Sequence, residues 1–195
     1  MSLELIKEIR AITGLPLNDI KKAIDTVGEN QDLIIKHLRE QGALKSSKRS
    51  DRSTENGFIF SYIHEGRIGV LVEILCETDF VSRSDDFKSF GQNICLHIVA
   101  TQPRFISSEE VDSTTIEEEM EIQRKLLLSE NKPADIIDKI LNGKKDKFFE
   151  EIVLLEQPFV KDQSIKIKDL LNSVSQKTGE KVIINRFSLF ILGRK

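Results

Sequence analysis

The chain has 195 residues, of which 39% are hydrophobic and 31% are charged, so it is long enough to form one sizeable core and a small second domain. Its formal net charge of -3 gives no global electrostatic reason to bind nucleic acid or an anionic membrane. No apolar stretch approaches transmembrane length, and the charged N-terminus is unlike a signal peptide, so we expect a cytoplasmic protein that binds neither membranes nor nucleic acid directly.

Residues 1–42 predict a three-helix N-terminal domain. Apolar residues recur at helical spacing in three segments, which end at Gly14, Gly28 and Gly42, where the left-handed backbone of a helix end favours glycine. Asn30 is suited to cap the third helix. So small a bundle has a thin core, and its outer faces are free to bind.

Residues 43–56 predict a linker. The stretch ALKSSKRSDRSTEN has one large apolar side chain and buries too little surface to offset the entropy lost on ordering. Its cations, Lys45, Lys48, Arg49 and Arg52, fit either a solvated hinge or frayed helix, or a strip that binds phosphates.

A β-hairpin and a helix are predicted next. From Gly57 the apolar period changes to two, and alternation over residues 58–64 and 68–75, around a Glu-Gly turn, indicates two antiparallel strands. Acidic residues then begin a helix whose apolar stripe ends before Pro103 and should pack on the sheet.

The remaining chain predicts further helices and a final strand. Helices are expected over residues 109–128, 132–143, 145–157 and 164–179, with Gly143 separating the second from the third. The β-branched and aromatic run of residues 180–193 predicts a strand. Residues 57–195 therefore form an α+β core, an antiparallel sheet of about three strands with helices on one face.

The sequence contains no signature of a catalytic or phosphate-binding site, such as GxxxxGK[ST], HExxH, GxSxG or GxGxxG. His37, His64 and His97 fall on different predicted elements, where each is expected to be a packed or surface histidine. Cys76 and Cys95 lack CxxC spacing and are expected to be reduced core thiols. We therefore expect no metal, no cofactor and no enzymatic activity.

The stretch CETDFVSRSDDF, residues 76–87, joins the second predicted strand to the following helix. Asp79 fits a turn or a helix start, and Phe80 fits a core residue because phenylalanine is usually buried. In an extended turn anchored by Thr78 and Val81, however, Asp79 and Phe80 would project from the surface. An exposed aromatic beside an acid is typical of a hot spot for a protein partner.

The segment CETDFVSR resembles the TDFV signature of the translation elongation factor Ts family. IKEIRAITG and NDIKKAI are similar to its N-terminal ubiquitin-associated-like domain, HEGRIGVLVEILCETDFV to its core hairpin, and GEKVIINRFSLFILG to its last strand. The similarity spans the whole chain in order. The loop of Leu15, Pro16, Leu17 and Asn18 departs from the Ala-Gly-Met-Met frequent in the family.

The resemblance implies a guanine-nucleotide exchange factor that binds elongation factor Tu, in its GDP-bound and nucleotide-free forms, and promotes GDP release in translation. Thr78, Asp79, Phe80 and Val81 match the motif that enters the partner's GTPase domain near its magnesium and phosphate site. Other positions matching family contacts lie in the N-terminal domain and just beyond it (Arg10, Lys21 and Arg49) and in the core (Ile68, Gly69 and His97).

The resemblance is to the short form of the family, because longer members carry two core subdomains and this chain has room for one. The short form is expected to be a homodimer, with the apolar terminal strand as a plausible contact. The alternatives are an RNA-binding or polyanion-binding module using the linker cations, a ubiquitin-associated-like adaptor without exchange activity, and an enzyme, for which the sequence offers no clustered pocket.

Overall fold

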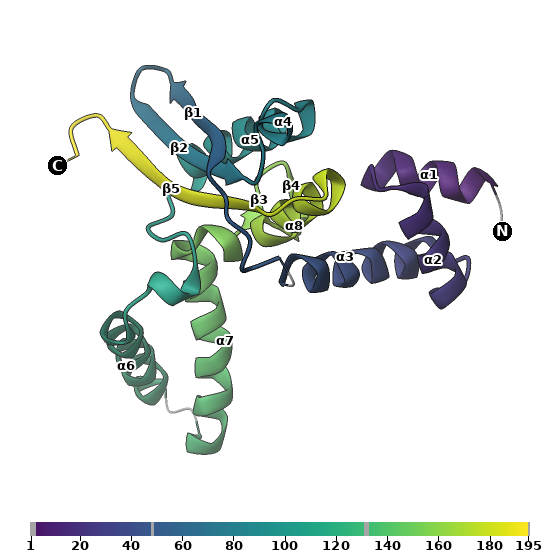
Figure 1. Ribbon diagram of the computed structural model, residues 1–195. Helices are drawn as coiled ribbons and strands as arrows, with labels where there is room; N and C mark the ends of the chain where they lie inside the picture. The colour runs from purple at the N-terminus through teal and green to yellow at the C-terminus, as the bar shows by residue number, and fades with distance from the viewer. Residues whose placement is uncertain (1–2, 48, 131–132, 195) are drawn as a thin grey trace. The chain divides into compact units, whose positions relative to one another are not determined.

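The computed structural model describes residues 3–47, 49–130 and 133–194, apart from the side chains of residues 43, 45–47, 134 and 135. The chain forms two compact units, one of Met1–Leu96 with Lys168–Lys195 and one of His97–Ile167. Figure 1 follows it from the N-terminal helices in purple to the C-terminal strand in yellow. None of the helices in the described ranges is long and apolar enough to cross a membrane.

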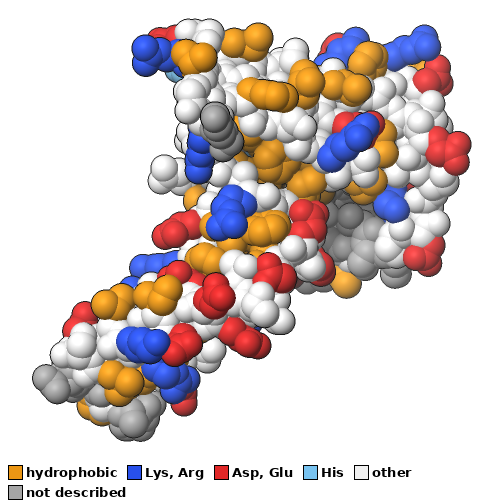
Figure 2. Space-filling view, turned by 90° about the vertical axis from the view of Figure 1, so that its left-hand side faces the viewer, with side chains coloured by type: hydrophobic (Ala, Val, Ile, Leu, Met, Phe, Trp, Pro, Cys, Tyr) orange, Lys and Arg blue, Asp and Glu red, His pale blue; other side chains and the backbone are white. Residues whose placement is uncertain are grey.

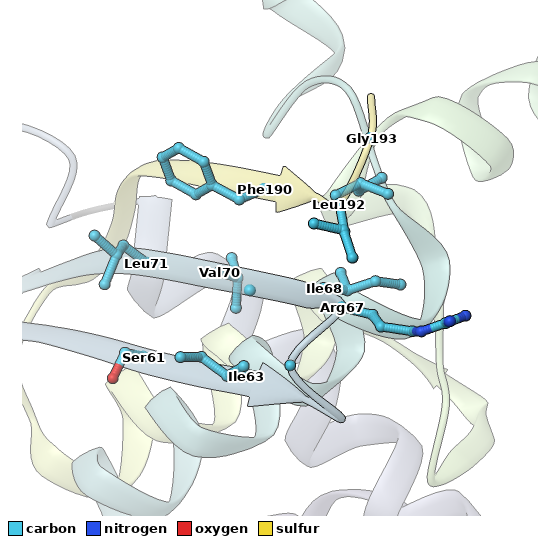
Figure 3. Close-up of a pocket in the computed structure, with 12 residues that line it drawn as sticks. Ser61, Ile63, Arg67, Ile68, Val70, Leu71, Phe190, Leu192 and Gly193 are labelled. Atoms are coloured by element: carbon cyan, nitrogen blue, oxygen red, sulfur yellow. The ribbon is translucent and has the colours of Figure 1, made fainter. Parts of the chain in front are cut away.

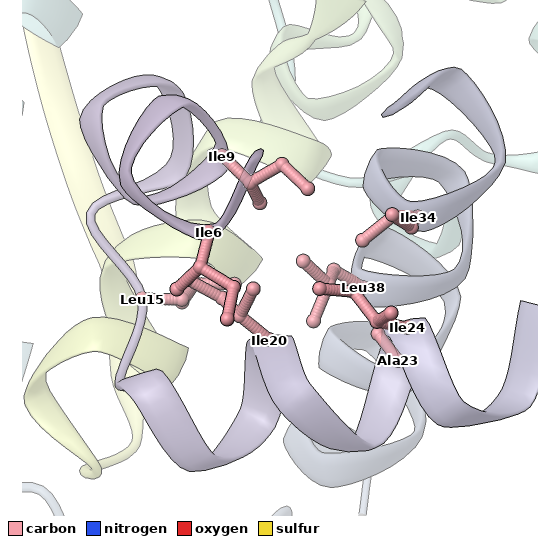
Figure 4. Close-up of a cluster of buried hydrophobic side chains, with 8 residues drawn as sticks. All are labelled: Ile6, Ile9, Leu15, Ile20, Ala23, Ile24, Ile34 and Leu38. Atoms are coloured by element: carbon pink, nitrogen blue, oxygen red, sulfur yellow. The ribbon is translucent and has the colours of Figure 1, made fainter. Parts of the chain in front are cut away.

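The N-terminal segment folds as three helices, as the sequence predicts: α1 (Leu3–Thr13), α2 (Leu17–Val27) and α3 (Gln31–Ser47). Gly14 and Gly28, which follow the first two helices, have φ angles of 66° and 83°. Asn30 Oδ1 accepts a hydrogen bond from the Leu33 amide at 3.0 Å and so caps α3. The apolar faces meet in a cluster of buried side chains drawn in Figure 4, comprising Ile6, Ile9, Leu15, Ile20, Ala23, Ile24, Ile34 and Leu38.

Helix α3 is longer than the sequence suggested. The sequence predicts an end at Gly42, but the helix continues to Ser47, so the predicted linker of residues 43–56 begins as helix. Gly42 lies inside the helix, where an added Cβ would come within 2.7 Å of Gln176 Oε1 in α8 (Ile167–Thr178). The missing side chain thus serves a close approach between two helices rather than a helix end.

Three antiparallel strands, β1 (Asn56–His64), β2 (Ile68–Cys76) and β5 (Val182–Ile191), form a sheet in the order β1-β2-β5. Helix α5 (Asp85–Thr101) covers one face, as Figure 1 shows. On that face the buried Phe60 ring lies 5.9 Å from the Phe87 ring, and Gly91 of α5 leaves room for it. The predicted α+β class, with helices on one face of a three-stranded sheet, is confirmed.

The second unit contains a hairpin of two long helices, α6 (Ser113–Ser129) and α7 (Ala134–Ile152), whose contact buries Leu127, Ile137 and Leu141. Asp112 caps α6 by accepting a hydrogen bond from the Thr115 amide at 2.7 Å. The 3-10 turns η1 (Ser108–Glu110) and η2 (Leu154–Glu156) flank the hairpin.

Two expectations for this region are wrong. Gly143 does not separate two helices but lies within α7, because burial of apolar residues along the helix outweighs the low helix propensity of one glycine. Residues 164–166, expected to begin the last helix, are not helical either. They belong to β4 (Asp162–Lys166), which pairs with β3 (Pro158–Phe159), so α8 begins at Ile167 rather than Ser164.

Candidate functional site

The corner after β2 is a short helical turn, α4 (Asp79–Ser82), rather than the extended turn expected from the sequence. Thr78 is its N-cap, with an extended backbone, and its Oγ1 accepts a hydrogen bond from the Val81 amide at 3.4 Å. Ser82 Oγ donates to the Asp79 carbonyl at 2.8 Å, and Ser84 Oγ donates to the Val81 carbonyl at 2.7 Å. Side-chain hydroxyls therefore hold a turn too short to be stable by itself.

This turn places neighbouring side chains on opposite sides. Val81 is only 8% exposed and anchors the turn, whereas Phe80 is 86% exposed. Phenylalanine is normally buried, yet Phe80 is the most exposed large hydrophobic side chain among the described residues. Of the two interpretations of Phe80, a core residue and a projecting one, the first is wrong and the second is confirmed, although a helical turn, not an extended one, produces the projection.

A brace of four residues, Glu77, Thr78, Glu180 and Lys181, holds the base of this corner. Glu180 accepts two hydrogen bonds from Thr78, one from its amide at 3.0 Å and one from its hydroxyl at 2.7 Å. Beside it, Glu77 accepts from the Lys181 amide at 2.6 Å and pairs with Arg52 at 3.1 Å. Burial by itself would raise the pKa of Glu77, but the Lys181 amide and Arg52 outweigh it and hold that pKa below its ordinary value.

Asp79 is also paired within the chain. Its carboxylate lies 3.1 Å from the Arg83 guanidinium, one helical turn away, and both side chains are largely exposed. An exposed pair of this kind contributes little to stability. Its effect is local, because the Arg83 charge offsets that of Asp79 next to the Phe80 ring.

The predicted basic contacts of the N-terminal region differ in their surroundings. Arg10 on α1 and Lys21 on α2 are exposed and free to reach a partner. Arg49 is half-buried, and its guanidinium donates to the Ser175 carbonyl of α8 at 2.8 Å. Of the loop that departs from the family pattern, Leu15 is a core residue, whereas Pro16, Leu17 and Asn18 are exposed.

Several bonds tie the predicted linker to the body of the first unit. In addition to the contacts of Arg49 and Arg52 described above, Nζ of Lys181, outside the linker, donates hydrogen bonds to the linker carbonyls of Ser50 and Arg52. Two of the four linker cations are thus engaged inside the chain, while Lys48 and the Lys45 side chain lie outside the described residues. Arg49 and Arg52 therefore do not form a free phosphate-binding strip.

The three predicted core contacts also differ. Ile68 and Gly69 of β2 are half-buried at the tip of the hairpin. His97 has no exposed surface: its Nδ1 accepts from the Val160 amide at 3.3 Å, and its Nε2 lies 2.9 Å from Gln157 Oε1. Burial lowers the pKa of His97, and the Gln157 contact opposes this only in part. A buried ring cannot touch a partner directly, so the expected direct contact of His97 is replaced by an internal one.

The outer face of the sheet carries an apolar groove of about 660 Å³ that the sequence did not indicate. Figure 3 shows the groove lined by Phe190 and Leu192 from the C-terminal end of the chain and by Leu71 of β2 and Ile63 of β1. Ile68 and Gly69 also line it. Phe190 and Leu192 are 66% and 75% exposed. Figure 2, a view of one side of the molecule, shows hydrophobic side chains gathered in its upper part among charges of both signs.

Within the described residues, no group of three or more His, Cys, Asp or Glu side chains is placed to hold a metal ion. Cys76 and Cys95 are buried and free, as expected. Burial raises the pKa of Cys76 to about 11 and that of Cys95 to about 12, which leaves both as unreactive thiols at neutral pH.

Comparison with known proteins assigns the chain to a family. A family model described as Elongation factor TS matches residues 4–194. The chain belongs to this family. Elongation factor Ts proteins from Herpetosiphon aurantiacus and Fervidobacterium nodosum are 43% and 42% identical to it, each over 99% of this chain and 98% of the relative. The protein from Alkaliphilus oremlandii is 42% identical over 99% of this chain and 89% of the relative.

Membership of a translation elongation factor family confirms the resemblance carried by the TDFV segment. The family motif predicted Thr78, Asp79, Phe80 and Val81 as site residues, but it gave no indication of Glu180. The hydrogen bonds of Glu180 cross 102 positions of sequence, and only the β2–β5 pairing brings these residues together.

Proposed function

We propose that this protein is a guanine-nucleotide exchange factor for elongation factor Tu, acting in translation elongation without catalysing a covalent reaction. Family membership supports the partner and the process. The single observation that carries the mechanism is Phe80, which is 86% exposed on a turn held by hydrogen bonds. A ring presented in this way enters a partner's pocket with little rearrangement.

The proposed action of Phe80 is to displace the elements that surround the partner's magnesium ion and GDP phosphates. A nucleotide bound at about nanomolar affinity, with an association rate of about 10⁶ M⁻¹s⁻¹, leaves at about 10⁻³ s⁻¹. A thousandfold acceleration requires about 4 kcal/mol. Burying one phenylalanine supplies only about 1.5–3 kcal/mol, so other contacts must contribute.

Those contacts come from the N-terminal helices and from the tip of the sheet. Arg10 and Lys21 of the N-terminal helices are exposed, and Ile68 and Gly69 offer the tip of the sheet. We assign His97 and Arg49 positioning roles, since both are engaged inside the chain. Docking through the exposed groups stabilises the nucleotide-free partner, and this difference in affinity between the two states drives release.

The role of Asp79 in this mechanism depends on the position of Arg83. Its charge would oppose the GDP phosphates, but Arg83 offsets it at 3.1 Å in the free protein. On docking, Arg83 must turn toward groups of the partner for the carboxylate to act on the phosphate site.

The exchange proposal is tested by release of fluorescent GDP from elongation factor Tu, chased with excess unlabelled GDP. The intact chain should raise the release rate in proportion to its concentration until the partner is saturated. A release rate that stays at its spontaneous value at every concentration would reject the function.

We also propose that the protein is a homodimer that pairs through the outer face of the sheet. Contiguous exposed apolar patches often mark interaction surfaces, and this face combines Ile63, Leu71, Phe190 and Leu192. β5 is also an edge strand of the described sheet. Light scattering should give twice the chain mass, and Phe190→Lys should halve it, whereas Ile122→Lys on α6 should not. A wild-type mass equal to one chain would contradict the dimer.

A further inference from the structure

The corner that presents Phe80 depends on contacts that continue the β2–β5 pairing beyond its last residue pair. That pair is Cys76 with Val182. Beyond it, each strand contributes one carboxylate and one amide: Glu180 accepts from the Thr78 amide at 3.0 Å, and Glu77 accepts from the Lys181 amide at 2.6 Å. The two chain segments therefore stay paired through side chains where the backbone ladder ends.

The hydroxyl of Thr78 connects this brace to the helical turn. It donates its hydrogen to Glu180 Oε1 at 2.7 Å, which leaves an oxygen lone pair to accept from the Val81 amide at 3.4 Å. Glu180 thus fixes both the backbone and the side-chain rotamer of Thr78, the N-cap residue of α4. Because α4 has only four residues, its direction depends on this start.

Phe80 has almost no packing of its own to fix its position. With 86% of its surface exposed, its direction is set by the turn beneath it, which is anchored at one end by Val81 and at the other by Thr78. A loosely held ring would lose rotational freedom on docking, and that loss weakens binding.

We infer that Glu180 is a positioning residue for nucleotide exchange, which orients Phe80 through its two hydrogen bonds to Thr78. The inference rests on the proposed exchange function. Glu180 itself contacts neither nucleotide nor partner in this role. Its contribution therefore exists only while the Phe80 ring is present.

Exchange rates of Glu180→Ala, Phe80→Ala and the double variant test this dependence. Glu180→Ala should lower kcat/KM for GDP release by at least about tenfold, the lower end of the loss expected for a hydrogen bond to a charged group. Glu180→Gln, which keeps one acceptor oxygen, should lie between Glu180→Ala and wild type. In the Phe80→Ala background, Glu180→Ala should cause less than about a twofold further loss, since a residue that acts through the ring has nothing left to position.

The matched control is Glu73→Ala. Glu73 also bridges β2 and β5, accepting from Asn185 at 2.6 Å and Arg186 at 2.8 Å, but away from the corner. Its removal should leave exchange unchanged. Losses that multiply in the Glu180 and Phe80 double variant, or an equal loss in Glu73→Ala, would overturn the positioning role.

Hydrogen exchange of the free protein separates this inference from the proposed function. Glu180→Ala should expose the amides of Thr78 and Val81 to solvent exchange at least about tenfold faster, whereas Glu73→Ala should not. If the wild-type chain fails to accelerate GDP release while these amides respond as expected, the exchange function fails and the brace stands. Unchanged protection of both amides in Glu180→Ala overturns the brace itself.

Discussion

Replacing Phe80 with alanine should separate folding from function in this protein. The ring is 86% exposed, so most of its apolar surface is already in water before any partner binds. Full burial of a phenylalanine is worth about 1.5–3 kcal/mol, and only a small part of that applies within the free chain. Phe80→Ala should therefore change the free energy of unfolding by less than about 0.5 kcal/mol.

The same substitution should have a large effect on exchange. If the partner buries the ring fully, its loss removes about 1.5–3 kcal/mol of stabilisation, which lowers kcat/KM for GDP release by about 10- to 150-fold. Thermal or denaturant unfolding and fluorescent GDP release measure the two quantities on one preparation.

The matched control is Phe87→Ala. Phe87 has no exposed surface and packs against Phe60, so its truncation should cost about 3–5 kcal/mol of stability. Two results would refute the reasoning: Phe80→Ala that destabilises the chain as much as Phe87→Ala, or Phe80→Ala that retains full exchange activity.

Two further predictions concern stability. Burial keeps the pKa of His97 in the folded chain below its pKa in the unfolded chain, so the unfolded chain binds more protons as pH falls below about 6.5. The free energy of unfolding should therefore drop by up to about 1.4 kcal/mol per pH unit in that range, and denaturant unfolding of His97→Gln should show a flatter pH profile. Gly143→Ala should stabilise the protein by about 0.5–1 kcal/mol, because the added Cβ inside α7 meets open space. Gly91→Ala should destabilise it by about 1–3 kcal/mol, because its Cβ would overlap the Phe60 ring. Thermal unfolding measures both, and a Tm lower for Gly143→Ala than for Gly91→Ala would contradict the packing.

Local patterns in the sequence predicted most of the elements. The change from helical to alternating spacing at Gly57 located the hairpin, and the acidic start after Ser84 located α5. Glycines were the main source of error, because Gly42 and Gly143 are compatible both with a helix end and with a helix interior. The choice depends on tertiary packing, which the local pattern does not contain.

The residues of the candidate site also differ in whether a local pattern or only tertiary packing reveals their environment. Phe80 was recognisable from a contiguous motif, and its exposure agrees with that reading. His97 was placed at a contact surface by resemblance, yet it is buried against Gln157, a residue 60 positions away. Glu180 and the apolar groove around Phe190 depend on strand pairing between distant segments, so no local signal could reveal them.

The most direct test of the mechanism is where Phe80 goes on docking. With p-benzoylphenylalanine in place of Phe80, photolysis of the nucleotide-free complex should crosslink the chain to the GTPase domain of elongation factor Tu, beside the groups that hold magnesium and phosphate, and excess GDP should suppress the crosslink. The same probe at Ile122, an exposed residue of α6, should not label that site. Crosslinks from position 80 only to other surfaces of the partner, in a chain that still accelerates GDP release, would contradict the account.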